Sequence, residues 1–557
     1  MICVKYLILA ARRWAALARI LRDVAVMATN PSVIIVGGSL NGLSAALLLA
    51  NRGVPCLVIE RHSHTTVQYK FRGISPRSME IYRSLGLESE IRARDPLDGT
   101  PAAVARVTNL QSADVSWQGV PWSDTRDISP TTGASCDQDL LEPILRAHAE
   151  QAGARVRFCS ELVGFAQNAH GVSARIRDCV TGHEEEVTAS YLIAADGAYS
   201  PIREMLGIPR HGPGVLQHWM NVIFETDLEP TLHGRPIRAV FVTDINGTLV
   251  PRSDGRWLMA VQYAPEAGQK PEDFNKELCR DLIRRGAGCA DLRVELVDVR
   301  PWEAAAAVAD RYRDGRVFLV GDSAHLMPPT GGFGGNTGIH DTFNLAWKID
   351  AVVRGIAGSR LLDTYDEERR FIADRTVGQA LARLRAWFPD PEKRLPPPED
   401  FVADDAVIFG YRYPSGAFIP DDSDRSDGTF EDPRTPSGRP GARAPHLLVE
   451  CDGQVQSTVD LFTGDWVLFA GPAGQAWRDA TARMRAARRF DLRCETIGDE
   501  DGIQDIDDRW ATTYHADDDG AVLIRPDGFV AWRGRDSHAV TQSALEAALE
   551  RLAFFGS

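Results

Sequence analysis

A glycine-containing turn between an apolar strand and an apolar helix constrains this chain more than any other feature. Residues 33–36 read Val-Ile-Ile-Val, a β-branched run typical of a buried parallel strand. The turn from Gly37 to Gly42 follows and leads into a helix rich in Ala and Leu. A second predicted strand, residues 56–59, ends at Glu60. This order predicts a βαβ unit, and therefore an α/β fold built on a parallel sheet.

The same turn has the spacing of a dinucleotide-binding fingerprint. Gly37 permits the tight turn, Gly42 lets the helix lie close to the strand, and backbone N–H groups at the helix start can bind a pyrophosphate. Glu60 is placed to accept hydrogen bonds from an adenosine ribose. Ser39 replaces the middle glycine, and a βαβ unit without a ligand is the alternative. The residues expected at the nucleotide are Gly37, Ser39, Leu40, Asn41, Gly42, Glu60 and Arg61.

Two later stretches indicate a flavin. An apolar strand ends at Asp196-Gly197, and another ends at Gly321-Asp322; the second is followed by Pro-Pro-Thr-Gly-Gly-Phe-Gly-Gly-Asn-Thr-Gly at 328–338 and an amphipathic helix. An acid at a strand end can accept hydrogen bonds from ribityl hydroxyls, and the helix directs its positive end at the ring. A flexible loop that caps a helix is the alternative. We expect Pro329, Gly332 and Phe333 against the ring, and Gly321, Asp322, Gly334, Gly335 and Asn336 among the flavin-binding residues.

These motifs, in this order, resemble the single-component FAD-dependent aromatic hydroxylases, and most closely their aromatic polyketide, aklavinone-type branch of antibiotic pathways. Further matching stretches are 71–80, 138–145, 344–348, 435–441 and 457–462. The resemblance, which runs from Pro31 to the C-terminus, implies non-covalent FAD, NADPH or NADH as cosubstrate, and O2. By position it also implies that Arg72, Gln138 and Asp196 contact the cofactor. A surface arginine before a helix and a polar residue at a helix start are the alternatives for the first two.

The resemblance also implies the domain organisation. A Rossmann-like FAD-binding domain of the para-hydroxybenzoate hydroxylase type is expected at 31–101, 132–209 and 301–389, with a β-rich substrate domain inserted at 102–131 and 210–300. A leader (1–30) is expected outside the fold, a linker or extended wrap at 390–434, and a thioredoxin-like α/β domain at 435–557. Trp219, Asn221 and Phe224 are candidate substrate contacts, for which core packing is an equal alternative.

Charge and cysteine content exclude several other classes. Lys and Arg number 62 against 77 Asp and Glu, a net charge of −15, which argues against nucleic acid and against stable association with an anionic membrane. The nine cysteines form no CxxC pair, so we expect a reducing cytoplasm, no structural zinc and no dithiol chemistry. The apolar run within the basic segment 1–26 is too short to span a bilayer. It is interpreted either as a surface helix or as an over-extended reading frame that begins before Met27.

The expected function is hydroxylation of a fused-ring phenol by a flavin, in which the protein positions the ring and supplies neither a nucleophile nor a metal. Baeyer–Villiger or another oxidation by the same fold is one alternative. A flavoprotein that binds a biosynthetic intermediate or partner without turnover is another, of a different class. A small aromatic substrate is the expected partner, and a homodimer is possible.

Overall fold

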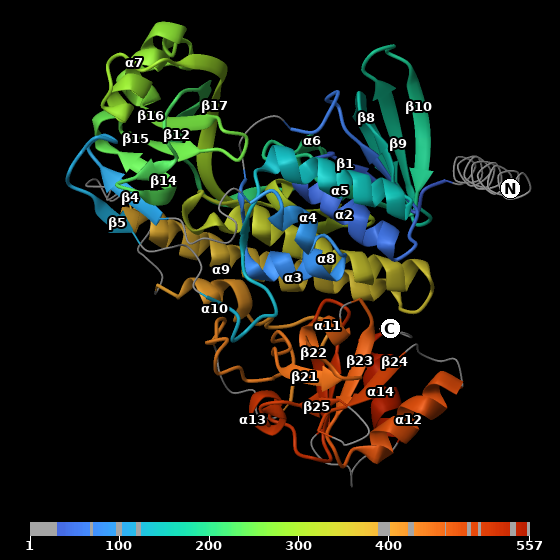
Figure 1. The fold of residues 1–557 in the computed structure, drawn as a ribbon. Coiled ribbons are helices and arrows are strands. Elements are labelled where there is room, and N and C mark those ends of the chain that lie inside the picture. Colours follow the sequence, from blue (N-terminus) through green and yellow to red (C-terminus); the bar gives the residue numbers. More distant parts are fainter. Residues whose placement is uncertain are drawn as a thin grey trace, which may run out of the picture.

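The structure is a computed structural model that describes residues 30–66, 71–95, 103–118, 124–387, 401–421, 428–462, 464–486, 492–498, 503–534 and 542–553. All of the predicted leader except Asn30 lies outside these ranges. Figure 1 shows three parts of the structure: a central domain, a sheet domain beside it and a C-terminal domain. None of the described helices is both long and apolar enough to cross a membrane.

The central domain contains a six-stranded sheet in the order β18-β19-β11-β1-β2-β7. Its strands are β1 (Val33–Val36), β2 (Cys56–Ile59), β7 (Arg155–Arg157), β11 (Tyr191–Ala194), β18 (Arg313–Asp314) and β19 (Val317–Leu319). All neighbours are parallel except β18 and β19. The predicted βαβ unit and parallel sheet are therefore confirmed, and the motifs that follow β1, β2, β11 and β19 meet at one edge of the sheet.

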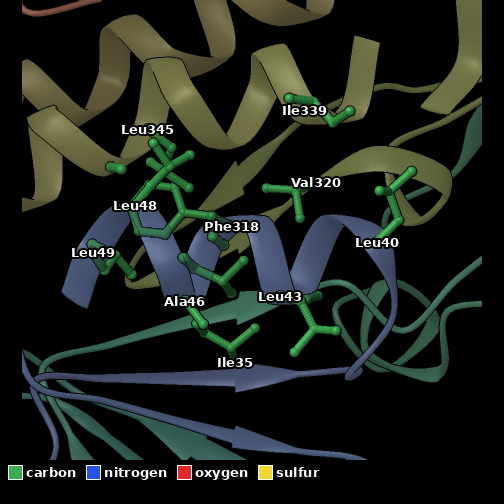
Figure 2. Packing of buried hydrophobic residues seen from close by; sticks show 14 of the residues in the cluster. Ile35, Leu40, Leu43, Ala46, Leu48, Leu49, Phe318, Val320, Ile339 and Leu345 are labelled. Carbon is green, nitrogen blue, oxygen red and sulfur yellow. The ribbon is translucent and has the colours of Figure 1, made fainter. Parts of the chain in front are cut away.

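Helices pack around this sheet in further layers. They are α2 (Leu40–Asn51), α3 (Pro76–Ser84), α4 (Glu88–Arg92), α5 (Gln138–Ala152), α6 (Pro201–Met205), α8 (Phe333–Val353) and α9 (Asp363–Trp387). Figure 2 shows α2 between the sheet and α8, with Ala46 near Ile35 of β1 and Leu48 facing Leu345 of α8. These residues belong to one buried apolar cluster. Because α2 packs on both layers, its N-terminal end has a defined place beside the start of α8.

Smaller strands complete the central domain. A three-stranded antiparallel sheet joins β8 (Ser160–Gln167), β9 (Val172–Asp178) and β10 (Glu184–Ala189). A two-stranded pair joins β3 (Gly73–Ile74) and β6 (Ala134–Ser135). Two short 3₁₀ turns matter for the site, η4 (Gly321–Ser323) and η5 (Thr330–Gly332).

The sheet domain is built on a nine-stranded sheet in the order β20-β17-β12-β16-β15-β14-β4-β5, with β13 paired to β14. The strands are β4 (Ala103–Val107), β5 (Ser116–Gln118), β12 (Arg210–Glu225), β13 (Thr231–Leu232), β14 (Arg235–Val242), β15 (Gly247–Pro251), β16 (Trp257–Tyr263), β17 (Glu295–Ala309) and β20 (His325–Leu326). The helix α7 (Lys276–Ala287) covers one face through a buried apolar cluster. The strands predicted near 219–225, 239–243 and 257–262 are confirmed, and β12 is longer than expected.

The C-terminal domain has a mixed four-stranded sheet in the order β24-β23-β26-β27. Its elements are β21 (Leu448–Cys451), β22 (Gln454–Ser457), α11 (Thr458–Phe462), β23 (Trp466–Ala470), α12 (Gln475–Ala486), β24 (Leu492–Thr496), β25 (Gln504–Asp505), α13 (Trp510–Tyr514), β26 (Ala521–Ile524), β27 (Val530–Gly534) and α14 (Gln542–Leu552). The hairpin predicted around Pro526-Asp527-Gly528 is confirmed as β26 and β27.

The stretch at 390–434, predicted as a linker or an extended wrap, is packed where the structure describes it. It contains α10 (Asp404–Phe409), and the side chains of Tyr411 and Tyr413 are buried against Phe529 of the C-terminal domain. The linker alternative is therefore wrong for these residues, because a freely solvated connection would not bury aromatic rings. Residues 388–400 and 422–427 lie outside the described residues.

Candidate active site

The turn between β1 and α2 is closed by backbone contacts that only glycine allows. Gly37 has φ +109°, and a Cβ there would overlap the carbonyl of Ala195 at the end of β11. A Cβ at Gly42 would overlap the carbonyl of Gly37. Without side chains at these two positions, α2 begins directly beside the strand ends, with its first N–H groups at the edge where the other motifs meet.

Glu60 supports this turn from the end of β2. Its carboxylate accepts a hydrogen bond from the N–H of Gly38 at 2.7 Å and another from the N–H of His62 at 2.9 Å. Glu60 is only 9% exposed, whereas Arg61 is exposed. The acid is thus held by the loop that it was predicted to complement.

Ser39, the departure from the glycine pattern, belongs to a small polar cluster. Its Oγ donates to Glu142 at 2.6 Å and accepts from Gln138 Nε2 at 2.9 Å, and Gln138 also donates to Glu142 at 2.7 Å. The N–H of Thr66 donates to the other oxygen of Glu142. Burial raises the pKa of Glu142. Sequence reasoning missed Glu142, although its position one helical turn after Gln138 was a usable signal.

Asn41 connects the turn at Gly37 to Gly42 with η4 and with α8. A Cβ at Gly321 or at Gly338 would overlap the Asn41 amide, so the starts of α2, η4 and α8 converge on this side chain. Asn41 Oδ1 is buried, and within the part of the chain that the structure describes it accepts no hydrogen bond. Leu40 is buried in the same region, and a Cβ at Gly335 would meet Leu40 and the ring of Phe71. The converging glycines and the unsatisfied amide oxygen suit a bound polar group.

The two acids at the strand ends differ in their surroundings. Asp322 in η4 is exposed. Asp196, in contrast, accepts hydrogen bonds from Ser200 Oγ at 2.6 Å and from the N–H of Ile202 at 3.0 Å, and burial raises its pKa. Asp196 thus holds the start of α6, and Asp322 is the carboxylate that remains open to a ligand.

Arg210, at the start of β12, joins the two strand-end turns and was missed by sequence reasoning. It donates to the carbonyls of Ala198 at 2.6 Å, Asp322 at 3.0 Å and Ser323 at 3.3 Å. Its own burial, with Arg203 nearby, lowers the pKa of Arg210 to about 10. The sequence carried no signal for this role, since it depends on the crossing of β12 from one domain to the other.

The glycine loop, residues 328–338, presents backbone rather than side chains. Gly331 and Gly332 have φ of +83° and +65°, Gly332 caps α8, and Pro329 and Gly332 are exposed. Gly334 and Gly335 are half-buried in the first turn of α8. The helix therefore directs its unpaired N–H groups and positive end toward the convergence of the motifs.

Two loop residues have roles that differ from the prediction. Phe333 was expected against a ligand ring, but it is 4% exposed and packs with Ile128, Ala380 and Val407, so it anchors the loop instead. Asn336 ties the loop to β3, because it accepts from the N–H of Ser75 at 2.8 Å and donates to the carbonyls of Gly73 and Gly332. His325, just before the loop, is fully buried and lies against Asp341.

Arg72 lies between the central and sheet domains. It is 6% exposed, donates to the carbonyl of Pro251 at 2.5 Å and lies 3.5 Å from Asp137. Arg252 pairs with Asp139 at 2.6 Å across the same boundary. These contacts fix the β15–β16 turn of the sheet domain to the start of α5, and they place Arg72 beside Gln138.

The sheet face that α7 does not cover carries a stacked indole pair. Trp219 of β12 is opposite Trp302 of β17, with ring centroids 5.8 Å apart and planes 13° from parallel. Trp302 Nε1 donates to Asn221 Oδ1 at 2.7 Å. Phe224, predicted beside them, is fully buried on the opposite face in the cluster under α7, so its pocket role is corrected. Trp302 was missed because pairing of β12 with β17 cannot be read from either strand alone.

The residues present fit a flavin dinucleotide. Four features meet at one edge of the sheet: closed glycine turns, Glu60 at the end of β2, the exposed Asp322 in η4 and the start of a helix. Among the described residues, no group of His, Cys, Asp and Glu is arranged as metal ligands.

Comparison with known proteins agrees with this site. Residues 30–380 match the model of an FAD binding domain, and residues 437–556 match the C-terminal domain of aromatic-ring hydroxylases. Aklavinone 12-hydroxylase from Streptomyces peucetius subsp. caesius is 43% identical over 82% of this chain and 94% of its own. A 4-methyl-5-nitrocatechol 5-monooxygenase from Burkholderia is 37% identical over 93% of this chain and 96% of its own. The crystal structure of aklavinone-11 hydroxylase with FAD and aklavinone has TM-score 0.87 and 36% identity, covering 94% of this chain and 99% of its own.

Proposed function

The chain belongs to the family of FAD-dependent aromatic-ring hydroxylases, and from that premise we propose that it hydroxylates a fused-ring phenol of the polyketide type. FAD, reduced by a nicotinamide cosubstrate, supplies the electrons and activates dioxygen. The protein binds the cofactor, orients the aromatic ring and excludes water. The described cysteines are all free, which supports a reducing cytoplasm as the setting.

The proposed cofactor site follows the order of the motifs along one sheet edge. Glu60 would hold the adenosine ribose, with Arg61 exposed beside it. The starts of α2 and α8 would bind phosphates and the ring edge through backbone N–H groups. Asp322 would accept hydrogen bonds from the ribityl chain. Residues assigned a contact are Gly37, Ser39, Leu40, Asn41, Gly42, Glu60, Asp322, Pro329, Gly332, Gly334 and Gly335, with Arg72, Gln138, Asp196, Gly321 and Asn336 holding these parts in place.

The indole pair is the observation that most favours a flat, fused-ring substrate. Trp219 and Trp302 are stacked on the face of the sheet that α7 does not cover, with Trp219 buried and Trp302 half-buried, and Trp302 holds the Asn221 amide in one orientation. Extended aromatic surfaces bind planar ligands by offset stacking. An oriented amide next to the stack can hydrogen-bond a phenol or quinone oxygen at the ligand's edge. Arg72 ties the end of β15, in the same sheet, to the central domain.

The test uses holoenzyme and 18O2. Purified protein should carry FAD that acid or heat releases, and a polyhydroxylated anthraquinone should accelerate NADPH or NADH oxidation and gain one 18O atom on a ring carbon. A substituted monocyclic catechol serves as the comparison substrate. Faster turnover of the catechol would contradict the fused-ring assignment. A product with oxygen inserted into a C–C bond would show Baeyer–Villiger chemistry, and ligand binding without turnover would show a non-catalytic flavoprotein.

A further inference from the structure

The turn of the β26–β27 hairpin belongs to the C-terminal domain and packs into the central domain. Figure 1 shows the C-terminal domain against the side that carries α3 and α8. At the tip of this hairpin Arg525, Asp527 and Phe529 are 0%, 1% and 2% exposed. Charged residues of a turn are normally solvated, so the burial of Arg525 and Asp527 indicates a contact that the fold of the C-terminal domain alone does not require.

The first part of this contact is a fully buried ionic cluster. Arg525 donates to both oxygens of Glu368 of α9, at 2.8 and 2.9 Å, and to both oxygens of Asp527, at 2.9 and 2.5 Å. Glu368 also pairs with Lys348 of α8 at 2.8 Å. Asn344 of α8 donates to Glu368 at 2.6 Å and to Asp527 at 3.2 Å. The Arg525 guanidinium thus ties the hairpin to α9 through Glu368, and Lys348 and Asn344 tie the same carboxylate to α8.

The second part continues from this cluster to the cofactor loops. Tyr413 Oη lies 3.3 Å from Asn344 Nδ2, whose two hydrogens are shared among Glu368, Asp527 and Tyr413, and it accepts from Arg369 at 3.4 Å. Arg369 donates to Asp341 at 2.8 Å and to the carbonyl of Thr337 at 3.3 Å. Asp341 in turn accepts from the N–H of Gly321 at 3.2 Å. An uninterrupted series of buried hydrogen bonds therefore joins Arg525 to η4 and to the first turn of α8.

We propose that Arg525 is a positioning residue for cofactor binding, which acts through Glu368, Asn344, Tyr413, Arg369 and Asp341 on the two loops that hold the flavin. The C-terminal domain then does more than add stability, because its docking and FAD binding favour the same arrangement of α8. The proposal rests on the cofactor site placed above. By linkage the coupling is reciprocal, so FAD must also strengthen the docking of the hairpin.

The physical reason lies in the cost of buried charge. Glu368 and Asp527 are fully desolvated, and each relies on Arg525 for two hydrogen bonds. If the guanidinium is lost or misplaced, these carboxylates must regain partners or water, which is costly in the interior. The available movements are those of α8, α9 and the hairpin. Since α8 also carries Thr337 and the glycine loop, such a movement changes the geometry that the cofactor meets.

The experiment measures the FAD dissociation constant of full-length apoprotein by fluorescence titration. Arg525→Lys keeps the charge but cannot make both bidentate pairs, and Tyr413→Phe removes one hydroxyl from the middle of the series. We expect each to weaken FAD binding about 2- to 30-fold, the range of couplings carried over such distances. The loss of FAD affinity in the double variant should be smaller than the product of the two single losses, because both substitutions interrupt the same series of hydrogen bonds.

Asp460→Asn is the matched control. Asp460 of the C-terminal domain pairs with Arg83 of α3 at 2.9 Å in a partly exposed ion pair that does not reach the cofactor loops. Such a pair contributes little, so FAD binding should stay within about twofold of wild type. Equal losses in Asp460→Asn and Arg525→Lys would mean that docking in general matters, and would overturn the assignment of Arg525.

Hydrogen exchange gives a readout that does not depend on turnover. FAD should slow amide exchange in peptides that cover residues 521–534 of the wild-type protein, and this protection should be lost in Arg525→Lys. Unchanged FAD affinity together with unchanged protection in Arg525→Lys and Tyr413→Phe would refute the proposal. If wild-type apoprotein bound no FAD, the cofactor site itself would be misplaced, which is a separate failure.

Discussion

The carboxylate of Glu60 accepts a hydrogen bond from the backbone N–H of Gly38, at 2.7 Å. Glu60 therefore shapes the nucleotide turn before any ligand arrives, in addition to its expected role at the ribose. Asp322 differs in this respect, because its carboxylate is exposed in the chain alone. Substitutions of these two acids of the proposed FAD site should therefore differ in their effect on the stability of the apoprotein.

We expect Glu60→Ala and Asp322→Ala to weaken FAD binding, and only Glu60→Ala to destabilise the apoprotein. Loss of the Glu60 acceptor leaves the buried N–H of Gly38 without its partner, at a cost of about 1–3 kcal/mol. Urea unfolding of the two apoproteins checks this. A destabilised Asp322→Ala apoprotein would show that Asp322 supports the fold as well.

Gly332→Val should uncouple the enzyme, so that reduced nicotinamide is consumed and hydrogen peroxide accumulates instead of product. Gly332 has φ +65°, which a β-branched residue adopts only with strain, and it caps α8, the helix whose start would face the ring in the proposed site. FAD content should be retained through the distant adenosine contacts. The measurement is the ratio of peroxide to hydroxylated product.

The matched control is Gly355→Val at the other end of α8, where φ is +70° and the space beside the residue is open. It imposes similar backbone strain far from the loop, so coupling should be unchanged. Normal coupling in Gly332→Val would show that the loop does not cradle the flavin.

Trp302→Phe should raise KM for a fused-ring substrate, and Trp302→Leu should raise it further, by about tenfold or more. Phe keeps an aromatic face but loses the N–H that orients Asn221, whereas Leu loses the stack as well, a loss of about 1–2 kcal/mol beyond area. Steady-state kinetics with the anthraquinone give the result. Trp117→Phe, half-buried on the edge strand β5 against the cluster under α7, serves as control and should leave KM unchanged.

Stability should fall between about pH 6.5 and pH 4 because of His446. Burial lowers the pKa of His446 in the folded C-terminal domain to about 4, and its Nδ1 lies 2.7 Å from Ser457 Oγ. In this window the unfolded chain binds the proton and the folded chain does not, so acid favours unfolding, by about 3 kcal/mol across the window. Urea titrations at pH 7, 5.5 and 4 measure the slope. His446→Gln should reduce the slope without abolishing it, because burial also lowers the pKa of His340. An unchanged slope would assign the effect to other groups.

The strands and the cofactor motifs were predictable because each is written in consecutive residues. The β-branched run at 33–36, the glycine turn and the Gly-Asp pair at Gly321-Asp322 all appear in the structure as local features. The residues that the prediction missed or misplaced depend on partners distant in sequence. Glu142 meets Ser39 only after α5 packs beside α2, and Trp302 meets Trp219 only after β17 pairs with β12.

Two misplaced residues show why residue type alone was insufficient. Phe224 lies in the strand that carries Trp219, but on the other face, because successive side chains of a strand alternate. Phe333 lies in a loop rich in glycine, yet the left-handed conformation of Gly331 and Gly332 turns it into the cluster beside α9. In both cases the backbone direction, which composition does not specify, decides the role.

The buried pairing of Arg525 with Glu368 has a consequence for biosynthesis. The two residues are 157 positions apart, and at about 5–20 residues per second the ribosome makes Glu368 roughly 8–30 s before Arg525. During that interval the nascent central domain carries a carboxylate destined for the interior without its guanidinium. By the proposal above, the nascent central domain should bind flavin less tightly until the hairpin that carries Arg525 has been made and has docked.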